Sequence, residues 1–415
     1  MKYIKQRGTE DIFGKYVKIL SKIESVFLNV ATLSGYSEIR TPMFEAVEVF
    51  SRSVGESSDI VKKEFYNFKD KGDREIALRP EGTASVIRAV IENKLLDKEP
   101  LPLKYCYSGP MFRYERPQSG RLRQFNQFGC EIIGAVPVYD DVDCLSLAVQ
   151  LLESIQIKNW TLEINNIGNF ESREKWISAL KKYLEPFKSQ LSELSQERLE
   201  SNPLRILDDK IDGKLDFVLN APKVSEFLSS EEKEAQSAIE KCLKDMGIKF
   251  KVNPNLVRGL DYYTNLVFEF IVDDSTVLAG GRYAKLVSEF GGENYSCIGF
   301  GAGLQRLCLL IEKQNTQLVD EDVCDVVIGA LTDDAKILSL SLLNDLRKNG
   351  VSAVCKFSLD KLVKVFSYAE RIKAKNVVII GAKELENKTV MVKNQTTLEQ
   401  KEIKIADLID FIKNK

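Results

Sequence analysis

The chain has 415 residues and a mass of 47.0 kDa, long enough for two or three domains with sizeable hydrophobic cores. It contains no histidine, which excludes general-base catalysis by imidazole, Ser-His-Asp triads and Cys-His nucleophiles. The formal charge is −2, but residues 323–415 carry 16 Lys and Arg against 12 Asp and Glu, a balance of +4 that leaves −6 for the rest. That excess permits a polyanionic partner without requiring one, because a solvated lysine-rich face has the same composition.

The cysteines and the distribution of apolar residues bear on the cellular compartment of the protein. Eight cysteines are scattered singly, with no C-x-x-C pair, so we expect reduced thiols and no structural zinc. No apolar run approaches membrane-spanning length, and the N-terminal residues lack a signal-peptide core. The expectation is a cytoplasmic protein with no membrane partner.

The N-terminal region predicts a helix followed by extended chain. Apolar residues recur at helical spacing over residues 16–33, and Gly35 marks a stop before an extended segment at residues 37–44. Further on, residues 76–89 (IALRPEGTASVIRA) predict a short strand, a turn and a helix that begins near Thr83. A second helix and a strand are expected to lead from there to residue 112.

Residues 112–134, FRYERPQSGRLRQFNQFGCEIIG, predict a β-hairpin. The first strand is expected at residues 112–115, where polar and aromatic side chains alternate, and the second strand runs from Arg121 onward. A loop of Pro, Ser and Gly would join the two strands.

Charged side chains line one face of the second predicted strand. Counting by twos from Arg121 puts Arg123, Gln127 and Glu131 on the same face. Guanidinium groups on an inward face keep their charge and must find anions, so phosphate is their natural partner. A salt-bridged surface hairpin is the alternative, because Glu115 and Glu131 could neutralise the arginines within the protein.

The middle of the chain changes in character. From about residue 171 to residue 252 the sequence is rich in Lys, Glu, Ser and Leu, looks mostly helical and has no glycine motif. We interpret it as an inserted helical module. Extended, glycine-punctuated sequence resumes at 256–270, 279–286 and 298–312, and the strands on either side of the insert are expected to share one sheet.

The last ninety or so residues alternate regularly between strand and helix. The expected elements are strand 323–330, helix 335–349, strand 351–357, helix 360–374, strand 377–381 and a last helix at 406–413. Such alternation implies βαβ connections and a separate α/β domain.

The segment GFGAGLQRL (299–307) places small residues at the end of a strand and Arg306 in the first turn of the following helix. A cation there opposes the helix dipole, so Arg306 makes more sense if it stacks on an adenine ring or meets phosphate. The glycines leave room for a ligand against the backbone, although close helix packing gives the same composition. The segment is neither a Walker A loop nor a Rossmann fingerprint.

Two further segments carry polar groups that suit an amino acid. In LVRGLDYYT (256–264), Tyr262 and Tyr263 would point to opposite faces of an ideal strand, so both reach one ligand only if a bulge or turn intervenes. One core and one surface tyrosine is the alternative. RPEGT (79–83) offers the carboxylate of Glu81 and the hydroxyl of Thr83, which suit an ammonium group. A segment suited to an ammonium group, an anion-binding hairpin and a glycine-rich segment that could lie under a nucleotide together suggest a site where an amino acid reacts with ATP.

Together these segments resemble the class II aminoacyl-tRNA synthetases, and specifically the histidyl-tRNA synthetase family, over the length of the chain. Residues 40–68 resemble the dimer-forming motif 1 and its extension, residues 112–134 resemble motif 2, and GFGAGLQRL resembles motif 3. RPEGT and LVRGLDYYT point to the histidyl family.

The resemblance implies an α+β fold in which an antiparallel sheet is flanked by helices. Residues 1–322 would form the class II catalytic domain, with the helical insertion at about 171–252. Residues 323–415 would form a C-terminal α/β anticodon-binding domain. The implied activity is that of a histidine–tRNA ligase, a cytoplasmic homodimer that activates L-histidine with ATP and Mg²⁺ and transfers histidine to the 3′ end of tRNA(His).

Residue roles follow from the same resemblance. The ATP contacts would be Arg113 on the α-phosphate, Glu115 on the adenine amino group, Arg121 on the terminal phosphates and Arg306 stacked on adenine. The histidine contacts would be Glu81, Thr83 and Gln127 on the ammonium, Arg113 and Arg258 near the carboxylate, and Glu131, Tyr262 and Tyr263 around the imidazole. Catalysis is assigned to Arg113 and Arg258, the tRNA acceptor end to Arg116 and Gln118, and no protein side chain is assigned to the metal.

Three positions depart from the family pattern. Asn126 stands where histidine is common, Gln305 where motif 3 usually has glutamate, and Ala284 where an aspartate often follows G-G-R-Y. By strand parity Asn126 points away from the chemistry, whereas Gln305 would remove a negative charge beside Arg306.

Two other functions fit parts of the pattern. One is a non-catalytic histidine-sensing paralogue similar to the regulatory subunit of ATP phosphoribosyltransferase, and the other is a class II synthetase for a different amino acid. The retained ATP arginines and the complete tail domain speak against the first, and Glu131 with the paired tyrosines against the second.

Overall fold

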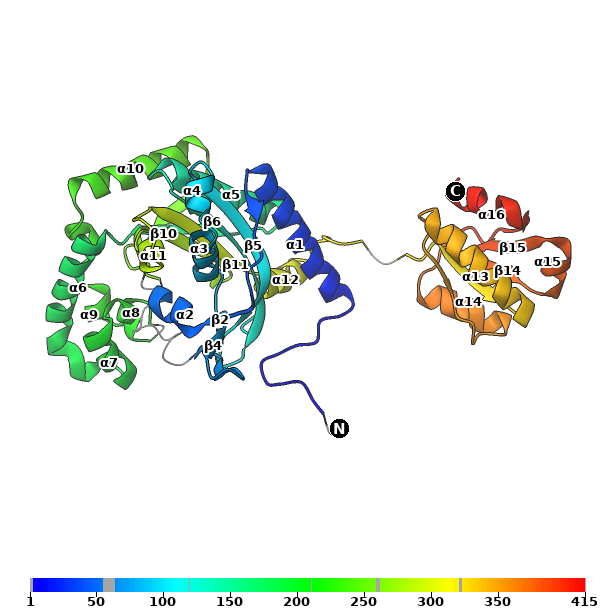
Figure 1. The fold of residues 1–415 in the computed structure, drawn as a ribbon, viewed down its shortest axis with the longest axis horizontal. Coiled ribbons are helices and arrows are strands. Elements are labelled where there is room, and N and C mark those ends of the chain that lie inside the picture. The colour runs from blue at the N-terminus through cyan, green and yellow to red at the C-terminus, as the bar shows by residue number, and fades with distance from the viewer. Residues whose placement is uncertain are drawn as a thin grey trace. The chain divides into compact units, whose positions relative to one another are not determined.

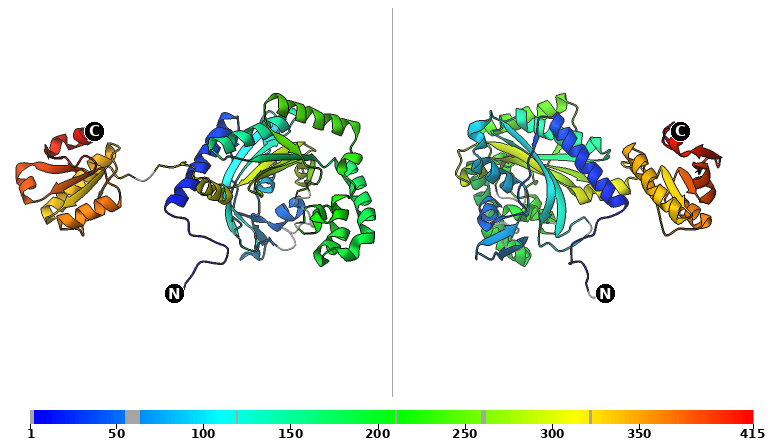
Figure 2. Two further views of the ribbon diagram at one scale, coloured as in Figure 1. Left: turned by 180° about the vertical axis from the view of Figure 1, so that it is seen from behind. Right: turned by 45° about the vertical axis from the view of Figure 1, so that its right-hand side comes forward.

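The structure, a computed structural model, describes residues 3–54, 64–118, 120–209, 211–258, 262–320 and 323–414. The chain divides into two compact units, Met1–Val319 and Asp320–Lys415, and each is described by itself (Figures 1 and 2). Residues 55–63 of the predicted motif 1 region, Ser119 of the predicted hairpin loop and Asp261 of LVRGLDYYT lie outside the described residues.

The first unit is built around an eight-stranded sheet in the order β1-β5-β6-β11-β10-β9-β7-β8. Neighbouring strands are antiparallel, except that β1 with β5 and β7 with β8 run parallel. Strands from both sides of the helical insert therefore share one sheet, as predicted. The strands are β1 (Ser37–Glu38), β5 (Leu103–Phe112), β6 (Gln124–Ile133), β7 (Thr161–Asn166), β8 (Phe250–Val252), β9 (Tyr263–Val272), β10 (Ser275–Tyr283) and β11 (Cys297–Gly303).

Helices cover both faces of this sheet (Figure 1). On one face, α1 (Lys15–Leu33), α5 (Tyr139–Ser154) and α12 (Leu304–Lys313) enclose a core with the alternate residues of β6, such as Phe128 and Cys130. The other face packs against α3 and part of the helical insert. The remaining helices of this layer are α2 (Val47–Val54), α3 (Thr83–Glu92), α4 (Leu95–Lys98) and α11 (Leu286–Glu289).

The insert is helical, as its composition predicts. Its helices are α6 (Phe170–Leu184), α7 (Glu193–Ser201), α8 (Leu204–Leu207), α9 (Asp216–Leu219) and α10 (Ser230–Asp245), with 3-10 turns at Glu185–Gln190, Asp212–Lys214 and Val224–Glu226. The last residues of the predicted helical stretch instead form β8, which pairs with β7 in the main sheet.

The predicted N-terminal helix is confirmed as α1, but the extended segment that follows it is not one strand. Its first residues form β1 in the main sheet, and its end enters β2 (Phe44–Ala46) of a separate three-stranded sheet. That sheet has the order β2-β4-β3, with β3 (Asn67–Lys69) and β4 (Glu75–Leu78), and β4 leads through the RPEGT turn into α3 as predicted.

The second unit is a five-stranded sheet in the order β13-β12-β14-β15-β16. The first three strands are parallel and joined by helices, which confirms the predicted βαβ pattern, whereas β15 and β16 form an antiparallel hairpin that was not predicted. Its elements are β12 (Val326–Ala330), α13 (Asp333–Lys348), β13 (Ala353–Cys355), α14 (Leu362–Arg371), β14 (Asn376–Ile380), α15 (Ala382–Asn387), β15 (Thr389–Asn394), β16 (Gln400–Lys404), a 3-10 turn at Ile405–Asp407 and α16 (Leu408–Lys413).

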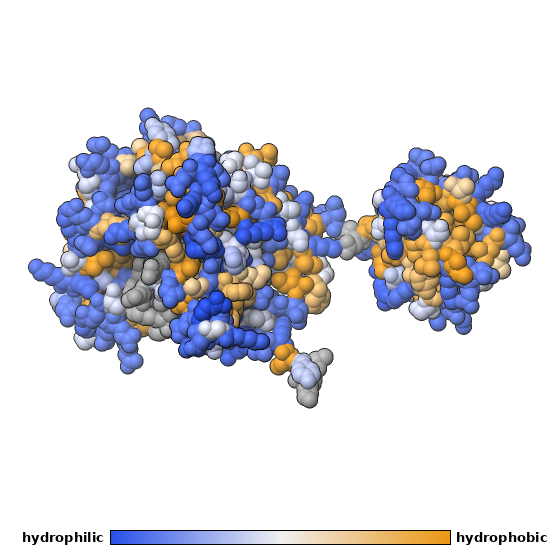
Figure 3. Space-filling view, viewed as in Figure 1, coloured by the Kyte–Doolittle hydropathy of each residue, from blue (hydrophilic) through white to orange (hydrophobic). Residues whose placement is uncertain are grey.

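The surface of the second unit is mixed in polarity. Figure 3 shows hydrophobic residues gathered on the face of this unit that is turned toward the viewer. Exposed apolar side chains of α13 include Ile337 and Leu340. In neither unit does the described part of the chain contain a helix with the length and apolar character needed to cross a membrane.

Candidate active site

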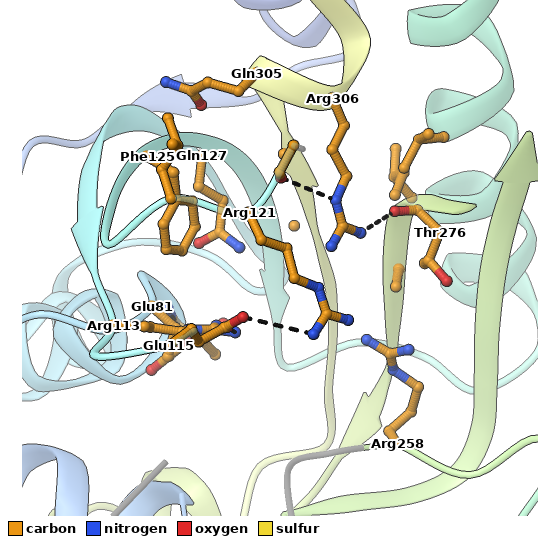
Figure 4. A pocket seen from close by; sticks show the side chains of 18 of the residues that line it. Glu81, Arg113, Glu115, Arg121, Phe125, Gln127, Arg258, Thr276, Gln305 and Arg306 are labelled. Atoms are coloured by element: carbon orange, nitrogen blue, oxygen red, sulfur yellow. Dashed lines mark hydrogen bonds and ion pairs between the residues drawn. The ribbon is translucent and has the colours of Figure 1, made fainter. Parts of the chain in front are cut away.

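A pocket of about 180 Å³ opens over strands β6, β9, β10 and β11 of the first unit (Figure 4). It brings together ten of the predicted side chains: Glu81, Thr83, Arg113, Glu115, Arg121, Gln127, Arg258, Tyr262, Tyr263 and Arg306. Glu131 is buried beneath the pocket, whereas Arg116 and Gln118 lie outside it on exposed chain. The residues come from segments that are more than two hundred positions apart in the sequence, and the sheet joins them.

Glu131 is the centre of a buried hydrogen-bond network. Only 1% of its surface is exposed, and it accepts hydrogen bonds from Thr83 Oγ1 at 2.6 Å, Tyr283 Oη at 2.7 Å and, more weakly, Tyr107 Oη at 3.4 Å. Burial raises the pKa of Glu131 to about 8, although these hydroxyl donors act in the opposite direction. The raised pKa favours the protonated form of Glu131 near neutral pH. Tyr107 and Tyr283 were not predicted from the sequence.

Glu81 is fixed by the N-terminus of α3. Its two carboxylate oxygens accept the backbone N–H groups of Thr83 at 2.7 Å and Ala84 at 2.9 Å. Burial raises its pKa, while these two N–H donors favour the charged form. The helix terminus thus holds the carboxylate in place, with further lone pairs available to a ligand.

Gln127 presents an acceptor without a donor. Its Oε1 atom is buried and has no hydrogen-bond partner among the described residues. Buried polar atoms are almost always paired in folded proteins, so an unpaired acceptor in a pocket wall points to a ligand that donates. An ammonium group meets this requirement.

The glycines of β11 make room for side chains of the neighbouring strand. A Cβ at Gly299 would overlap Glu131 Oε2, and a Cβ at Gly301 would overlap Gln127 Nε2. By contrast, the nearest atom to a Cβ at Gly303 is Arg306 Cδ at 4.0 Å. At Gly299 and Gly301 the space therefore holds the ligand-facing side chains of β6. Gly301 and Gly303 also line the pocket, so the expectation that the glycines free space for the ligand itself stays a prediction.

Tyr262 and Tyr263 both line the pocket, because Tyr262 lies in the turn that leads into β9 rather than in the strand. Tyr263 is the first residue of β9, and Tyr262 precedes the strand. Their ring centroids lie 4.6 Å apart, and both residues are buried. Strand alternation alone would have sent one of them to the opposite face.

The hairpin differs from its prediction in its first strand. β5 ends at Phe112, which pairs with Gln124, so residues 113–115 belong to the connection rather than to a strand. The backbone N–H of Tyr114 bonds to Glu64 O at 2.8 Å instead of continuing the ladder. The predicted strand is confirmed at Phe112 and wrong for residues 113–115, because the sequence alternation there does not reveal which residues find strand partners.

The predicted common face of the second strand holds only where β6 exists. Gln127 and Glu131 lie on the pocket side, whereas Arg123 precedes the strand and its guanidinium stacks 3.7 Å from the centroid of the Tyr114 ring. Arg123 is therefore corrected from the pocket face to a cation-π contact outside it. Arg121 reaches the pocket from the connection.

Four arginines surround the open half of the pocket (Figure 4). Arg113 Nε donates to Pro80 O at 2.8 Å, but its NH1 atom lies 3.9 Å from Glu115 Oε1. Arg121 NH1 lies 3.6 Å from Glu115 Oε2, and its side chain is 43% exposed. One carboxylate at these separations leaves most of the positive charge uncompensated, which favours an anionic ligand.

Arg306 is oriented by main-chain oxygens. Its Nε donates to Gly120 O at 3.3 Å, and its NH1 donates to Thr276 O. Burial lowers the pKa of this guanidinium, and the positive charge of Arg121 acts in the same direction. Carbonyl partners hold the planar group at its edge without neutralising it, so its face stays available for stacking.

Arg258 has a partner that the sequence did not reveal. Its NH1 forms an ion pair with Glu269 of β9, and Glu269 Oε2 accepts a hydrogen bond from Thr276 Oγ1 at 2.7 Å. Arg258 Nε is buried and has no hydrogen-bond partner among the described residues. The only sequence signal for Glu269 is its place between Phe268 and Phe270, whose alternation puts Glu269 on the other face of the strand.

The departures at Asn126 and Gln305 contact each other. Gln305 Oε1 accepts the backbone N–H of Asn126 at 2.7 Å, and Asn126 Nδ2 donates to Glu24 of α1 at 3.1 Å. Successive residues on a helix point about 100° apart, so Gln305 and Arg306 diverge (Figure 4). The parity prediction for Asn126 is confirmed, because its side chain bonds Glu24 outside the pocket. Gln305 lines the pocket together with Arg306, so the expectation that it removes a charge there stays a prediction. Ala284 directly follows β10 and is half-buried.

Comparisons with known proteins cover the whole chain. A profile described as Histidyl-tRNA synthetase matches residues 8–307, and one described as Anticodon binding domain matches residues 325–415. The chain is similar to the histidine–tRNA ligase of Malacoplasma penetrans, at 46% identity over 99% of this chain and 97% of that protein. It is 44% identical to the histidine–tRNA ligase of Ureaplasma parvum over 96% of each chain. The crystal structure of apo S. aureus histidyl-tRNA synthetase matches with a TM-score of 0.83 and 37% identity, over 99% of this chain and 100% of that one.

Proposed function

The chain belongs to the histidyl-tRNA synthetase family, and from this premise we propose which of its residues perform each step of the reaction. It is a histidine–tRNA ligase. It activates L-histidine with ATP to histidyl-adenylate and pyrophosphate, and then transfers histidine to the 3′ end of tRNA(His). The single observation that carries the residue assignment is the pocket that joins the acidic and hydroxyl groups around Glu131 to four arginines.

We assign the buried half of the pocket to histidine. The unpaired Oε1 of Gln127, together with Glu81 and Thr83, would accept the hydrogens of the ammonium group. Glu131 would bond one imidazole nitrogen, with Tyr262 and Tyr263 enclosing the ring. Because Thr83 and Tyr283 already fix the carboxyl group of Glu131, the imidazole meets a partner whose position is set before binding.

We assign the arginine-lined half to ATP. In the activation step a carboxylate oxygen of histidine forms a bond to the α-phosphorus while the bond from that phosphorus to pyrophosphate breaks. Arg258 and Arg113 would hold the reacting carboxylate and α-phosphate, Arg121 the terminal phosphates, and Arg306 and Glu115 the adenine. Such a reaction needs alignment and positive charge rather than a protein base, which suits a chain without histidine.

Mg²⁺ would be bound mainly through ATP. The described residues contain no group of three or more acidic or cysteine side chains that could hold a metal on their own. A pocket rich in arginine fits a Mg²⁺ that keeps waters and phosphate oxygens as ligands, since Mg²⁺ commonly binds nucleotides in this way. Bound there, it would neutralise charge on the phosphates. The chain's own residues would still align the α-phosphate.

The second step needs access for RNA. Arg116 and Gln118 are exposed on the connection between β5 and β6, and Gln118 and Arg121 pair through their backbones to form a tight loop beside the pocket. We propose that this loop contacts the acceptor end of the tRNA. We likewise assign residues 1–322 to catalysis, with the insertion at about 171–252, and residues 323–415 to the anticodon, supported by the two matched profiles.

We infer a homodimer from the surface around the predicted motif 1. Phe44 and Phe68 of the small sheet are 57% and 50% exposed, and Met43 beside them is 50% exposed. Such a group of large apolar side chains on one small sheet favours burial against a second copy. Light scattering during gel filtration would test it, because a mass of 47 kDa rather than twice that value contradicts the dimer. We place the enzyme in the cytoplasm, a proposal that the free cysteines support.

The activity is tested by ATP–pyrophosphate exchange with each of the twenty amino acids offered in turn. We expect exchange with histidine and aminoacylation of a tRNA(His) transcript by the same preparation. Tight histidine binding without exchange would favour the histidine-sensing alternative, which the full-length similarity to histidine–tRNA ligases does not favour. Exchange with another amino acid alone would contradict the substrate assignment.

A further inference from the structure

Glu269 contacts two residues that line the pocket, Arg258 and Thr276, but has no assigned part in substrate binding. It lies on β9 with its side chain only 12% exposed, in an ion pair with Arg258. The directly opposite residue on β7 is Glu163, which is bonded instead by Asn253 Nδ2 at 2.7 Å. Two carboxylates that face each other across neighbouring strands repel, so the position of Glu269 requires a compensating cation. Arg258 is that cation.

Thr276 joins Glu269 to a second arginine. The Thr276 hydroxyl donates to Glu269 Oε2 at 2.7 Å, and the Thr276 carbonyl accepts from Arg306 NH1. The pairing of β10 with β9 shifts register between Thr276 and Leu278, so a bulge sets the direction of this residue. One short unit, Glu269 with Thr276, therefore contacts both Arg258 and Arg306.

The contacts of Arg258 leave one edge of its guanidinium for a ligand. NH1 is bonded to Glu269, whereas Nε is buried and has no partner among the described residues. A guanidinium carries five N–H donors in a rigid plane, so a partner that fixes one edge also fixes the direction of the others. A buried charged group held on one side and unsatisfied on the other is arranged to receive an anion.

We propose that Glu269 is a positioning residue for activation. Together with Thr276 it directs Arg258 toward the reacting carboxylate and α-phosphate, and it fixes the position of Arg306 relative to Arg258. This inference rests on the proposed assignment of Arg258. Glu269 does not touch the substrates in this scheme. Its negative charge weakens the attraction of the pocket for ATP, and in return it holds the guanidinium in the geometry that the transition state needs.

This role predicts a loss of kcat without a rise in the KM for ATP. Glu269→Gln removes the charge but keeps the size, so Arg258 loses its fixed direction while the pocket becomes more positive. We expect kcat for ATP–pyrophosphate exchange to fall roughly ten- to a hundredfold, as misplacement of a reacting group does. The KM for ATP should fall or stay the same, because one repulsive charge has been removed.

Matched variants separate positioning from general damage. Thr276→Val should lower kcat less than Glu269→Gln does, because it removes the hydroxyl of residue 276 and keeps the carbonyl that binds Arg306. Thr276→Ser keeps the hydroxyl and should retain a kcat near the wild-type value. Glu163→Gln is the control, since it removes the facing carboxylate on β7 that bonds Asn253. We expect this variant to keep the wild-type kcat and KM for ATP.

Three outcomes would overturn the proposal. An unchanged kcat in Glu269→Gln with a lower melting temperature would show a purely structural carboxylate. A raised KM for ATP would show that Glu269 supports ground-state binding, and an altered dependence of kcat on Mg²⁺ concentration would make it a metal ligand. Calorimetric titration of each variant with ATP alone distinguishes these results from a failure of the histidine assignment, because ATP binding by the wild-type protein does not depend on which amino acid is activated.

Discussion

The two halves of the pocket are built on different principles. In the histidine half, Glu131 and Glu81 are buried and each is already bonded by donors from the protein. In the ATP half, Arg113 and Arg121 lie 3.9 Å and 3.6 Å from the one carboxylate of Glu115, and the side chain of Arg121 is 43% exposed. The carboxylates of the first half are thus fixed by the protein, with Gln127 Oε1 left for the ligand, whereas Arg113 and Arg121 of the second half have only a distant carboxylate.

The two halves therefore recognise their ligands differently, the histidine half by fixed geometry and the ATP half by charge. Buried donors and acceptors that are fixed in place discriminate strongly, because a wrong ligand leaves them unpaired. Loosely paired cations attract any polyanion and take up their final geometry when it arrives. We therefore expect changes to the ATP half to reduce the rate of activation and changes to the histidine half to reduce affinity for histidine.

The largest effect is expected from the arginines. Arg258→Ala and Arg113→Ala should each lower the rate of ATP–pyrophosphate exchange on the order of 10² or more, because each removes positive charge from the transition state. The exchange rate of Arg258→Lys should lie between those of the wild type and the alanine variant, since lysine keeps the charge but lacks the planar pair of N–H donors. Near-normal exchange in either alanine variant would remove that residue from the mechanism and weaken the contrast between the halves.

The next largest effect is expected from a change that replaces no substrate-facing side chain. Gly299→Ala would place a methyl group where Glu131 Oε2 lies, with backbone behind it at Cys130 O. Overpacking of this kind costs typically about 1–3 kcal/mol, so the KM for histidine should rise on the order of tenfold. Exchange assays at varied histidine would measure it.

Gly303→Ala provides the comparison for that experiment. It lies on the same strand, and the nearest atom to its added Cβ is 4.0 Å away. Its KM for histidine should stay close to the wild-type value. Equal effects of the two alanines would mean that the glycines of β11 do not support Glu131 in the way described.

A smaller effect is expected from pH. Glu131 holds its proton up to about pH 8, and free imidazole gains one below about pH 6.5. We assume that the complex holds one titratable proton, shared between Glu131 and the imidazole. Before binding, the two groups together carry two of these protons below about pH 6.5, one between pH 6.5 and pH 8, and none above pH 8. Affinity for histidine is then highest between these values and falls about tenfold per pH unit on either side.

Glu131→Gln tests the predicted fall in affinity for histidine above pH 8. Glutamine cannot release the proton, so the fall in affinity above pH 8 that comes from Glu131 should disappear. Calorimetric titration with histidine in the absence of ATP measures it, and titration of the ligand's own ammonium group affects both proteins equally. The same decline in both proteins would show that the charge state of Glu131 does not govern binding.

The smallest effect on activity is expected at Asn126 and Gln305. Asn126→His and Gln305→Glu should each cost about 1–2 kcal/mol of stability, because each disturbs the paired amides beside Glu24. The double variant should cost less than the sum, since an imidazole can donate to the new carboxylate. Urea unfolding followed by the fluorescence of Trp160 and Trp176, both in the first unit, measures this coupling. A loss of exchange activity without a loss of stability in Gln305→Glu would show that Gln305 acts at the ATP site.

Local patterns were sufficient for much of the fold. Alternation along β6 correctly separated Gln127 and Glu131 from Asn126, because the direction of a side chain on a strand depends only on its position in that strand. Helical spacing likewise predicted α1, and strand–helix alternation predicted the parallel part of the tail sheet. These features follow from geometry within one element.

The amino-acid sequence revealed which chemical groups the protein can use: ten of the side chains that line the pocket, the absence of imidazole, and the family resemblance that connects them. How these groups are arranged depends on the tertiary fold. It ended β5 before Arg113, filled the space at Gly299 with Glu131, paired Arg258 with Glu269 and turned Gln305 toward Asn126. Each of these depends on which distant segment lies alongside. Strand pairing and helix packing set that neighbour, and no periodicity within a single segment encodes it.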